Sequence, residues 1–161
     1  MKVKGAEYEI IKLLGKGKGG YSYLAKKGDA LFVLKQIHHE PCEYYTFGNK
    51  IEAERRDYGR LKAAGIRIPE MMDIDTENER ILKEYIDGPT AQELVAQQLM
   101  DENCLSQLKE MAEKAKAAGL NIDYYPTNFI LQDGLLYYID YECNEYMAQW
   151  SLEEWGMQYW K

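Results

Sequence analysis

Cysteine is scarce in this sequence and widely scattered. Its 161 residues include only three cysteines, Cys42, Cys104 and Cys143. This odd number at wide spacings matches neither a disulfide framework nor paired zinc ligands, so we expect ordinary reduced side chains. Long apolar runs are also missing, since none approaches the 18 residues of a membrane-spanning helix. Because Met1 to Gly5 lack the apolar core of a signal peptide, we expect a cytoplasmic protein without a membrane span.

Positive charge is in the minority. Twenty Lys and Arg residues against 27 Asp and Glu residues give a net charge of −7 and a pI near 5.0. Binding to DNA or RNA needs clustered lysine and arginine, so we expect no nucleic-acid partner. A local basic pocket for a small anion is still compatible with this balance. Low-complexity tracts are absent and 46% of the residues are hydrophobic, which is typical of one folded globular domain.

Short apolar runs dominate the first half of the chain. Three of them, residues 8–14, 21–24 and 31–34, are separated by turn residues. This pattern predicts a three-stranded antiparallel meander. Two more runs, 71–74 and 81–86, flank a polar segment, and the acidic residues 73–79 are expected to form its solvated tip. The five predicted strands complete one antiparallel sheet.

One helix is predicted between these two groups of strands. Apolar residues recur there at spacings of three and four, which predicts a helix from about Gly48 to Ala64, ended by Gly65. Glu54 lies on the same stripe as the apolar residues. Because a carboxylate is costly to desolvate alone, Glu54 requires a partner.

The pattern changes after residue 86. Thr90 and Glu93 form a capping box that opens a helix through about Gln98, and a longer amphipathic helix follows Asp101. We therefore expect a lobe boundary near Asp87, with an N-lobe over about 1–86 and a C-lobe over about 87–161.

Two local signals define the end of the chain. Asp133-Gly134 separates two apolar runs and is the strongest two-residue hairpin signal. Ser151 and Glu154 form a second capping box, flanked by Trp150 and Trp155, which predicts a short C-terminal helix. We expect its aromatic side chains to pack on the lobe core.

A glycine-rich turn links the first two strands. Gly15, Gly17 and Gly20 match G-x-G-x-x-G, but they lie between two strands and do not open a helix. This context disfavours a dinucleotide-binding fold and favours a flap whose backbone amides approach the phosphates of a nucleotide. A flexible hairpin turn without a ligand explains the pattern equally well.

A lysine at the end of the third strand fits the same ligand. Lys35 follows Gly20 by fifteen residues, and Glu54 follows Lys35 by nineteen. A lysine at a strand end is more often simply solvated. An ion pair between Lys35 and Glu54 would explain both residues and would hold the ammonium against the α- and β-phosphates. Glu52 points about 200° around the helix from Glu54 and is the weaker candidate.

Acidic and amide side chains follow the long helix. Asp123 and Asn128 have the D-x-x-x-x-N spacing of a phosphotransfer loop, in which the aspartate accepts a hydroxyl proton and the asparagine binds Mg²⁺. As isolated residues, both are more typical of turns. A tight turn at 133–134 places Asn128 opposite Ile139, with Asp140 at the neighbouring rung. Oxygens from Asn128 and Asp140 would then suit one shared hard cation.

In this order, these positions resemble the protein-kinase-like superfamily, particularly its small atypical members. These are the aminoglycoside/choline phosphotransferases, the lipopolysaccharide kinases and the Bud32/RIO-type kinases. The resemblance covers nearly the whole chain. It implies a glycine loop at Gly15, Gly17 and Gly20, a phosphate-positioning pair of Lys35 and Glu54, an adenine-binding backbone at Glu84, Tyr85 and Ile86, a catalytic Asp123, and magnesium ligands Asn128 and Asp140.

The departures from the family pattern are also informative. Asn121 stands in place of the usual histidine, Tyr125 in place of a lysine, and Tyr141-Glu142 in place of Phe-Gly. Only 21 residues follow Asp140, which leaves no room for an activation segment. The acceptor site is therefore expected to be missing or to come from elsewhere.

We expect a minimal bilobal kinase-like α+β fold, with a five-stranded antiparallel N-lobe sheet, one helix, and a truncated, mainly helical C-lobe. The expected activity is transfer of the γ-phosphoryl group of ATP, with Mg²⁺, to a hydroxyl group of an unidentified small molecule or protein. A protein partner that completes the C-lobe is a further expectation. The alternatives are a nucleotide-binding pseudokinase with a regulatory or scaffolding role, and an interaction module that binds no nucleotide.

Overall fold

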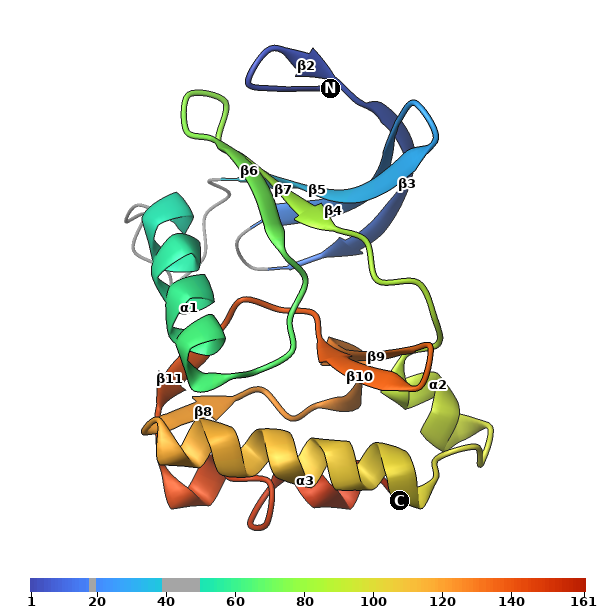
Figure 1. The fold of residues 1–161 in the computed structure, drawn as a ribbon, viewed down its shortest axis with the longest axis vertical. Coiled ribbons are helices and arrows are strands. Elements are labelled where there is room, and N and C mark those ends of the chain that lie inside the picture. Colours follow the sequence, from blue (N-terminus) through green and yellow to red (C-terminus); the bar gives the residue numbers. More distant parts are fainter. Residues whose placement is uncertain (18–19, 39–49) are drawn as a thin grey trace. The chain divides into compact units, whose positions relative to one another are not determined.

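The structure is a computed structural model that describes residues 1–17, 20–38 and 50–161 (Figure 1). The chain divides into two compact units, one of residues 1–55 and 70–85 and the other of residues 56–69 and 86–161. Cys42 and the predicted helix start at Gly48 lie outside the described residues. Cys104 and Cys143 are free and buried, and burial raises the pKa of each thiol to about 11. No helix in the described part is long and apolar enough to cross a membrane.

A five-stranded antiparallel sheet forms the first unit, as predicted. Its strands are β3 (Glu9–Lys16), β4 (Gly20–Lys27), β5 (Ala30–Ile37), β6 (Met71–Asp75) and β7 (Arg80–Glu84), in the order β3-β4-β5-β7-β6. A small hairpin of β1 (Lys2–Val3) and β2 (Ala6–Glu7) precedes them. Val3, Tyr8, Ala25, Leu34 and Leu82 form a buried cluster in this unit. The predicted α+β fold class is therefore confirmed.

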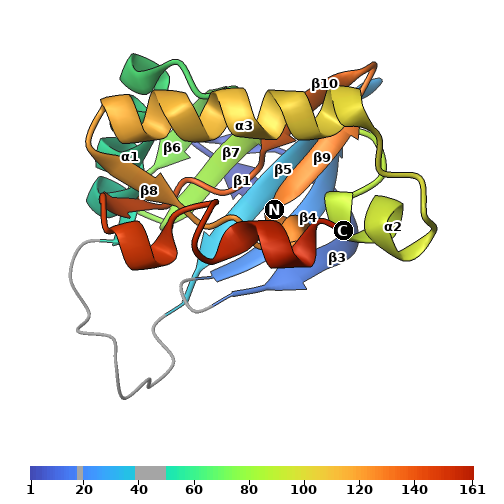
Figure 2. The same ribbon diagram turned by 90° about the horizontal axis from the view of Figure 1, so that it is seen from below.

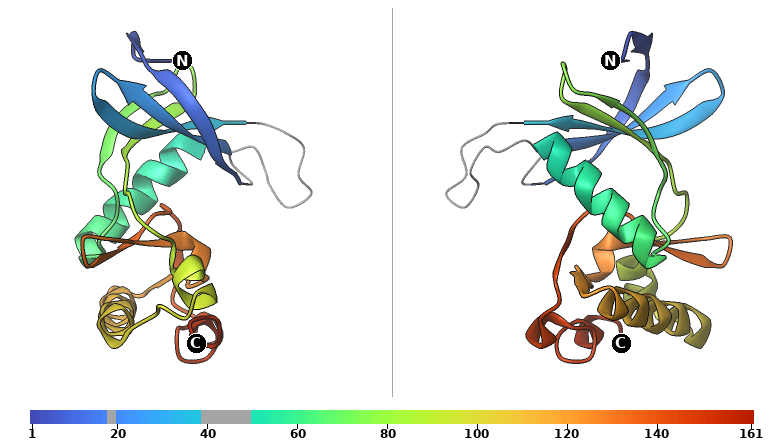
Figure 3. Two further views of the ribbon diagram at one scale, coloured as in Figure 1. Left: turned by 90° about the vertical axis from the view of Figure 1, so that its right-hand side faces the viewer. Right: turned by 60° about the vertical axis from the view of Figure 1, so that its left-hand side comes forward.

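Helix α1 (Lys50–Ala64) packs on the sheet through its first turn. Ile51 forms a buried cluster with Ile37 on β5 and Ile81 on β7. Ile81 lies directly opposite Lys35, and directly opposed residues share a face of a sheet. The face that α1 covers is therefore the one that carries Lys35, and Figure 3 shows the first turns of α1 beside the sheet.

Asp75 corrects the expectation of a fully solvated tip at residues 73–79. It is only 5% exposed and accepts three hydrogen bonds of 2.9 Å, from the backbone and side-chain nitrogens of Asn78 and from the backbone nitrogen of Lys4. These bonds lower the pKa of Asp75 to about 2. No local sequence pattern predicted these hydrogen bonds, because one of the donors, the Lys4 amide, lies 71 residues away from Asp75 in the sequence.

The second unit begins with helices α2 (Ala91–Ala96) and α3 (Glu102–Ala117). Thr90 caps α2 by accepting from the Glu93 amide at 3.1 Å, and Asp101 caps α3 by accepting from the Cys104 amide at 2.9 Å. Helix α2 ends two residues before the predicted Gln98. Figure 2 shows α3 running beside the C-terminal segment.

Two short antiparallel ribbons complete this unit. The predicted hairpin consists of β9 (Phe129–Gln132) and β10 (Leu135–Tyr138), and its register pairs Gln132 with Leu135. A second ribbon, which no sequence pattern predicted, pairs β8 (Leu120–Ile122) with β11 (Cys143–Glu145). It pairs the segment before Asp123 with the segment after Asp140.

The C-terminal segment is built from turns and 3₁₀ helices rather than the expected helix. Two 3₁₀ helices cover Ala148–Trp150 and Gly156–Tyr159, and Ser151 caps the turn between them. Gly156 is required there, because an added Cβ would lie 2.6 Å from the Cβ of Tyr124. Trp160 is fully buried, and its indole nitrogen donates to the Tyr124 carbonyl at 2.7 Å. The end of the chain is therefore part of this unit's core.

The pKa of Asp75 leads to a pH-dependent stability. A carboxylate with a lowered folded-state pKa stabilises the fold above its unfolded pKa, and this stabilisation is lost as pH falls from about 4 to about 2. We expect Asp75→Asn to unfold more easily at pH 7 and to lose less stability over that acid range, as measured by chemical denaturation at several pH values. Glu77→Gln, at the exposed tip, is the control. Parallel acid profiles for wild type and Asp75→Asn would contradict the role given to Asp75.

Trp160 gives a second stability test. We expect Trp160→Ala to lower the free energy of unfolding by about 3–5 kcal/mol, because a large buried side chain is replaced by a cavity. Trp150 is the matched control, because it is 48% exposed and packs edge-to-face on Trp155. Trp150→Ala should cost no more than about 1 kcal/mol. Equal effects in urea denaturation would show that the terminal segment is not part of the core.

Candidate active site

Lys35 and Glu54 form an ion pair in the first unit. The Lys35 ammonium contacts Oε1 of Glu54, and the two side chains are only 16% and 13% exposed. The second carboxylate oxygen, Oε2, is buried and has no hydrogen-bond partner among the described residues. Such a pair holds the lysine ammonium in place on the sheet.

The glycine turn lies next to this pair in the same unit. A Cβ on Gly20 would lie 2.5 Å from the Gln36 carbonyl oxygen and 3.2 Å from Cε of Lys35, so only glycine fits there. The Gly17 amide donates to the Gly20 carbonyl at 2.9 Å, and the Gly17 carbonyl lies 3.1 Å from Nε2 of His38. Gly15 and Gly17 are exposed, whereas Lys18 and Gly19 lie outside the described residues. The turn thus brings the buried backbone of Gly20 close to Lys35.

Strand β7 ends at Glu84, Tyr85 is the last residue of the first unit, and Ile86 starts the longer segment of the second unit. The Glu84 amide donates to the Glu70 carbonyl at 2.9 Å, and the Glu84 carboxylate accepts from the Glu70 amide at 3.1 Å. The Glu84 amide is therefore engaged within the protein. Any base recognition by Glu84, Tyr85 and Ile86 must use their other backbone groups.

The second unit holds Asp123 in an exposed loop between β8 and β9. Its Oδ1 accepts from the Tyr125 amide at 3.1 Å, and its carbonyl accepts from the Asn128 side chain at 3.4 Å. A 3₁₀ turn over Pro126–Asn128 follows directly. The loop therefore presents the Asp123 carboxylate to solvent in one defined orientation.

The buried side chain of Tyr138 hydrogen-bonds to the backbone of this loop, a role that no sequence pattern indicated. Its hydroxyl accepts from the Asp123 amide at 3.2 Å and donates to the Glu142 carbonyl at 2.8 Å. Burial raises the pKa of Tyr138 well above the usual value, so the hydroxyl stays protonated and keeps donating. One buried side chain thus joins the loop of Asp123 to the segment after Asp140.

Asn128 and Asp140 lie side by side at the base of the β9–β10 hairpin. The Ile139 amide donates to the Asn128 carbonyl at 2.9 Å, which continues the hairpin register by one rung and places Asp140 next to it. Oδ1 of Asp140 accepts from the Tyr141 amide at 2.8 Å. Both side chains are half-buried.

Asn128 and Asp140 would form a site with only two protein oxygen ligands, and magnesium uses such a site more often than a complete set of protein ligands. Mg²⁺ is usually held by one or two protein oxygens together with substrate phosphates and water. Within the described residues, no three His, Cys, Asp or Glu side chains gather into a metal-binding group. The chemistry of one amide oxygen and one carboxylate therefore fits a cation that is shared with a phosphate ligand.

Tyr141 and Asn121, two of the departures from the family pattern, make contacts in this unit that the sequence did not predict. The ring of Tyr141 packs against Tyr58 of α1 at 5.0 Å, and its hydroxyl donates to the Pro69 carbonyl. Asn121, the residue in place of the usual histidine, is 6% exposed and donates to the Met147 carbonyl at 2.8 Å. These contacts join segments distant in sequence, which is why local patterns did not reveal them.

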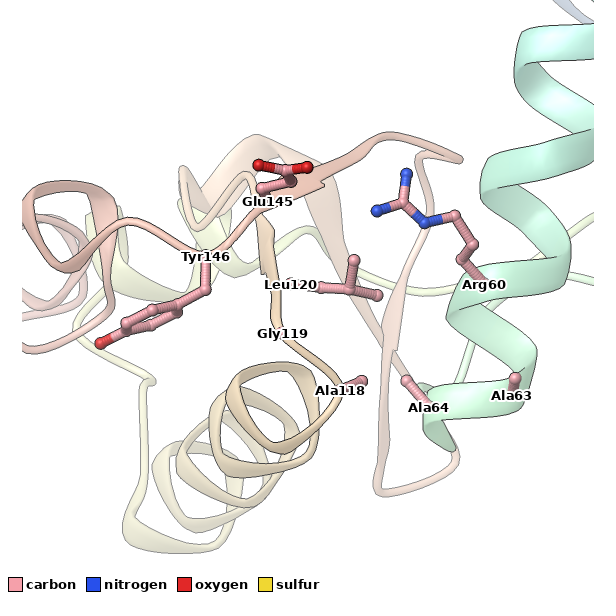
Figure 4. A pocket seen from close by; sticks show the side chains of 8 residues that line it. All are labelled: Arg60, Ala63, Ala64, Ala118, Gly119, Leu120, Glu145 and Tyr146. Atoms are coloured by element: carbon pink, nitrogen blue, oxygen red, sulfur yellow. The ribbon is translucent and has the colours of Figure 1, made fainter.

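A cavity of about 680 Å³ lies elsewhere in the second unit (Figure 4). It opens where α1 and α3 end, and its lining includes Arg60, Leu120, Glu145 and Tyr146. None of the predicted site residues lines it. This cavity and the predicted site residues therefore do not coincide.

The five-stranded antiparallel sheet with few helices agrees with the expected minimal kinase-like α+β fold. No protein-family model matches the chain. Two curated proteins are similar to it. The "KEOPS complex subunit Bud32" of Pyrococcus abyssi (strain GE5 / Orsay) is 26% identical over 150 residues, which cover 84% of this chain and 68% of that protein. The resemblance to Bud32-type members of the kinase-like superfamily is thereby confirmed.

The second relative is much longer than this chain. A "probable bifunctional tRNA threonylcarbamoyladenosine biosynthesis protein" of Methanobrevibacter smithii (strain ATCC 35061 / DSM 861 / OCM 144 / PS) is 30% identical over 146 residues. The match covers 86% of this chain but only 24% of that protein. The similarity therefore concerns one part of the bifunctional protein.

The burial of the Lys35–Glu54 pair can be tested on one helix. We expect Glu54→Gln to lower the free energy of unfolding by about 1–3 kcal/mol, because it leaves the Lys35 ammonium poorly paired. Glu52 is the matched control, because it pairs with Arg55 on the same helix but both side chains are about half exposed. Glu52→Gln should cost less than about 1 kcal/mol. Similar losses in the two variants, measured by urea denaturation, would contradict the structural importance of the Glu54 pair.

Proposed function

We propose that this chain is an ATP-dependent phosphotransferase of the Bud32 type. The observation that carries the proposal is the Lys35–Glu54 ion pair beside the glycine turn. A solvated surface lysine needs no buried partner, whereas a lysine that positions phosphates must be kept in place. The Glu54 side chain that pairs with Lys35 is only 13% exposed. The similarity to Bud32 supports the same reading.

Each residue then has a role that its surroundings support. Lys35 donates to the phosphates, and Glu54 holds the ammonium. The glycine turn would lie against the phosphates, and Asn128 and Asp140 would hold Mg²⁺. When bound, the metal ion compensates charge on the phosphates during transfer.

Asp123 supplies the proton acceptor in this proposal. Its carboxylate is exposed and oriented by the Tyr125 amide. An acceptor hydroxyl gives its proton to Asp123 while its oxygen bonds to the γ-phosphorus, and the bond from that phosphorus to the oxygen of ADP breaks. Tyr125 stands where many protein kinases carry a lysine, so charge on the transferred group must be met by Lys35 and the metal ion.

The names of the relatives suggest the setting of this reaction. One is named as a subunit of the KEOPS complex and the other as a tRNA threonylcarbamoyladenosine biosynthesis protein. We therefore propose that the chain works with partner proteins in tRNA modification. Its net charge of −7 favours contact with tRNA through such partners rather than through the chain itself.

A second candidate function is a nucleotide-binding subunit that does not turn over ATP. Two observations favour it: the relative is named as a subunit of a complex, and Asn121 and Tyr125 replace two residues usual in active kinases. In this case nucleotide binding would regulate or support assembly. Binding is shared by both candidates, and only phosphate transfer separates them.

The test combines binding with turnover. We expect Mg-ATP to raise the melting temperature, as any ligand that binds the folded state must. We expect Asp123→Asn to reduce phosphate release from γ-labelled ATP about 10²–10⁴-fold while leaving the ATP-induced rise unchanged, because the amide keeps the oxygen that accepts from Tyr125. Asp29→Asn, in the exposed β4–β5 turn, is the control and should match wild type.

Each result separates the candidates. A folded protein whose melting temperature does not respond to millimolar Mg-ATP contradicts both functions. A rise without phosphate release by wild type supports the non-catalytic subunit. Equal release by wild type and Asp123→Asn contradicts the role of Asp123 as the proton acceptor.

A further inference from the structure

Exposed aromatic side chains gather in one place in the second unit. Among the residues that the structure describes, the exposed ones are Tyr125 at 41%, Trp150 at 48% and Tyr159 at 37%. Trp155 joins them into one row, because its ring lies 5.8 Å from that of Trp150 and 5.4 Å from that of Tyr159. The Tyr159 ring in turn lies 5.1 Å from that of Tyr125. We call these four residues the aromatic row.

The rings of the aromatic row meet edge to face, at interplanar angles between 64° and 88°. Such contacts fix the orientation of each ring but leave part of its flat face uncovered. The row is not what holds the chain end, because Trp160 makes the buried contact with the Tyr124 backbone. Contiguous exposed apolar side chains of this kind typically mark a binding surface.

One end of the aromatic row reaches the loop of Asp123. The Tyr125 amide donates to the Asp123 carboxylate at 3.1 Å. Burial and, after it, the negative charge of Glu153 raise the pKa of Tyr124, which follows Asp123 in the same loop. Glu153 is therefore also close to this loop. A ligand bound along the row lies beside the Asp123 carboxylate.

The stretch of chain that carries the row has charge of only one sign. From residue 117 to residue 160 the sequence contains seven Asp and Glu residues and no Lys or Arg, and the next basic residue is Lys161. Glu153 and Glu154 are exposed and lie between the two tryptophans of the row. Acidic surroundings repel the phosphates of single-stranded RNA, which proteins otherwise bind on aromatic rows. They attract a cationic partner.

We infer that the aromatic row, with Glu153 and Glu154, is a docking surface for an arginine-rich segment of a partner polypeptide. Arginine matches both parts of this surface. Its planar guanidinium stacks on Trp and Tyr rings and also pairs with carboxylates through two parallel hydrogen bonds. The lysine ammonium is more strongly hydrated and has no plane to stack. Docking needs no nucleotide, so this inference goes beyond the proposed function.

Two acetylated Gly-Ser peptides, one with arginines and one with the same number of lysines, are the probes. Their dissociation constants would be measured by calorimetry on the full chain without nucleotide. We expect the arginine peptide to bind wild type about fivefold more tightly than the lysine peptide, because only the guanidinium gains from stacking. Trp150→Ala should remove this preference. Leu99→Ala, which changes an exposed apolar side chain outside the row, should leave it unchanged.

A second pair of variants tests the charge. Glu154→Gln and Glu77→Gln remove the same charge from exposed positions, but only Glu154 adjoins the aromatic row. We expect Glu154→Gln to weaken the arginine peptide about threefold and Glu77→Gln to have little effect, because exposed charges more than about 10 Å apart are largely screened at 0.1 M salt.

Each outcome bears on the inference. An arginine preference that is lost in Trp150→Ala and kept in Leu99→Ala supports it, as does a loss of affinity confined to Glu154→Gln. Equal binding of the two peptides, or equal effects within either pair of variants, overturns it and indicates general attraction to an acidic chain. Tighter binding of oligouridine than of the arginine peptide, or a dimer that Trp150→Ala dissociates in sedimentation, overturns the choice of partner. None of these results changes the tests of ATP binding and phosphate release.

Discussion

The ion pair between Lys35 and Glu54 is the contact on which the candidate site depends. Burying either charge alone would cost free energy, so each residue needs the other as its partner. The pair joins β5 to α1, whose Ile51 packs on the same sheet face. Tyr58, four residues after Glu54, belongs to the second unit and packs on Tyr141, next to Asp140.

Positioning in the second unit relies on buried groups that touch backbone rather than on contacts among the functional side chains. Tyr138 bonds to the Asp123 amide, and Trp160 bonds to the Tyr124 carbonyl. Tyr138 and Trp160 are both fully buried. The loop is thereby ordered while the Asp123 carboxylate stays exposed. These contacts with the loop do not involve the Asp123 carboxylate.

Charge is used in two different ways in the first unit. Asp75 lies buried among neutral donors and ties the N-terminal hairpin to the β6–β7 turn. The charge of Lys35 is instead compensated by a second charge, that of Glu54, and both side chains are largely buried.

The sequence by itself determined the features that depend on neighbouring residues. Turn residues and alternating apolar runs predicted the five strands, and Asp133-Gly134 predicted the hairpin register that sets Asn128 beside Asp140. The Lys35–Glu54 pair followed from an unpaired carboxylate on an apolar stripe. The β8–β11 ribbon, the buried Asp75 and the place of Trp160 in the core were decided only by the tertiary structure. Each depends on groups far apart in the chain, and local periodicity carries no information about such contacts.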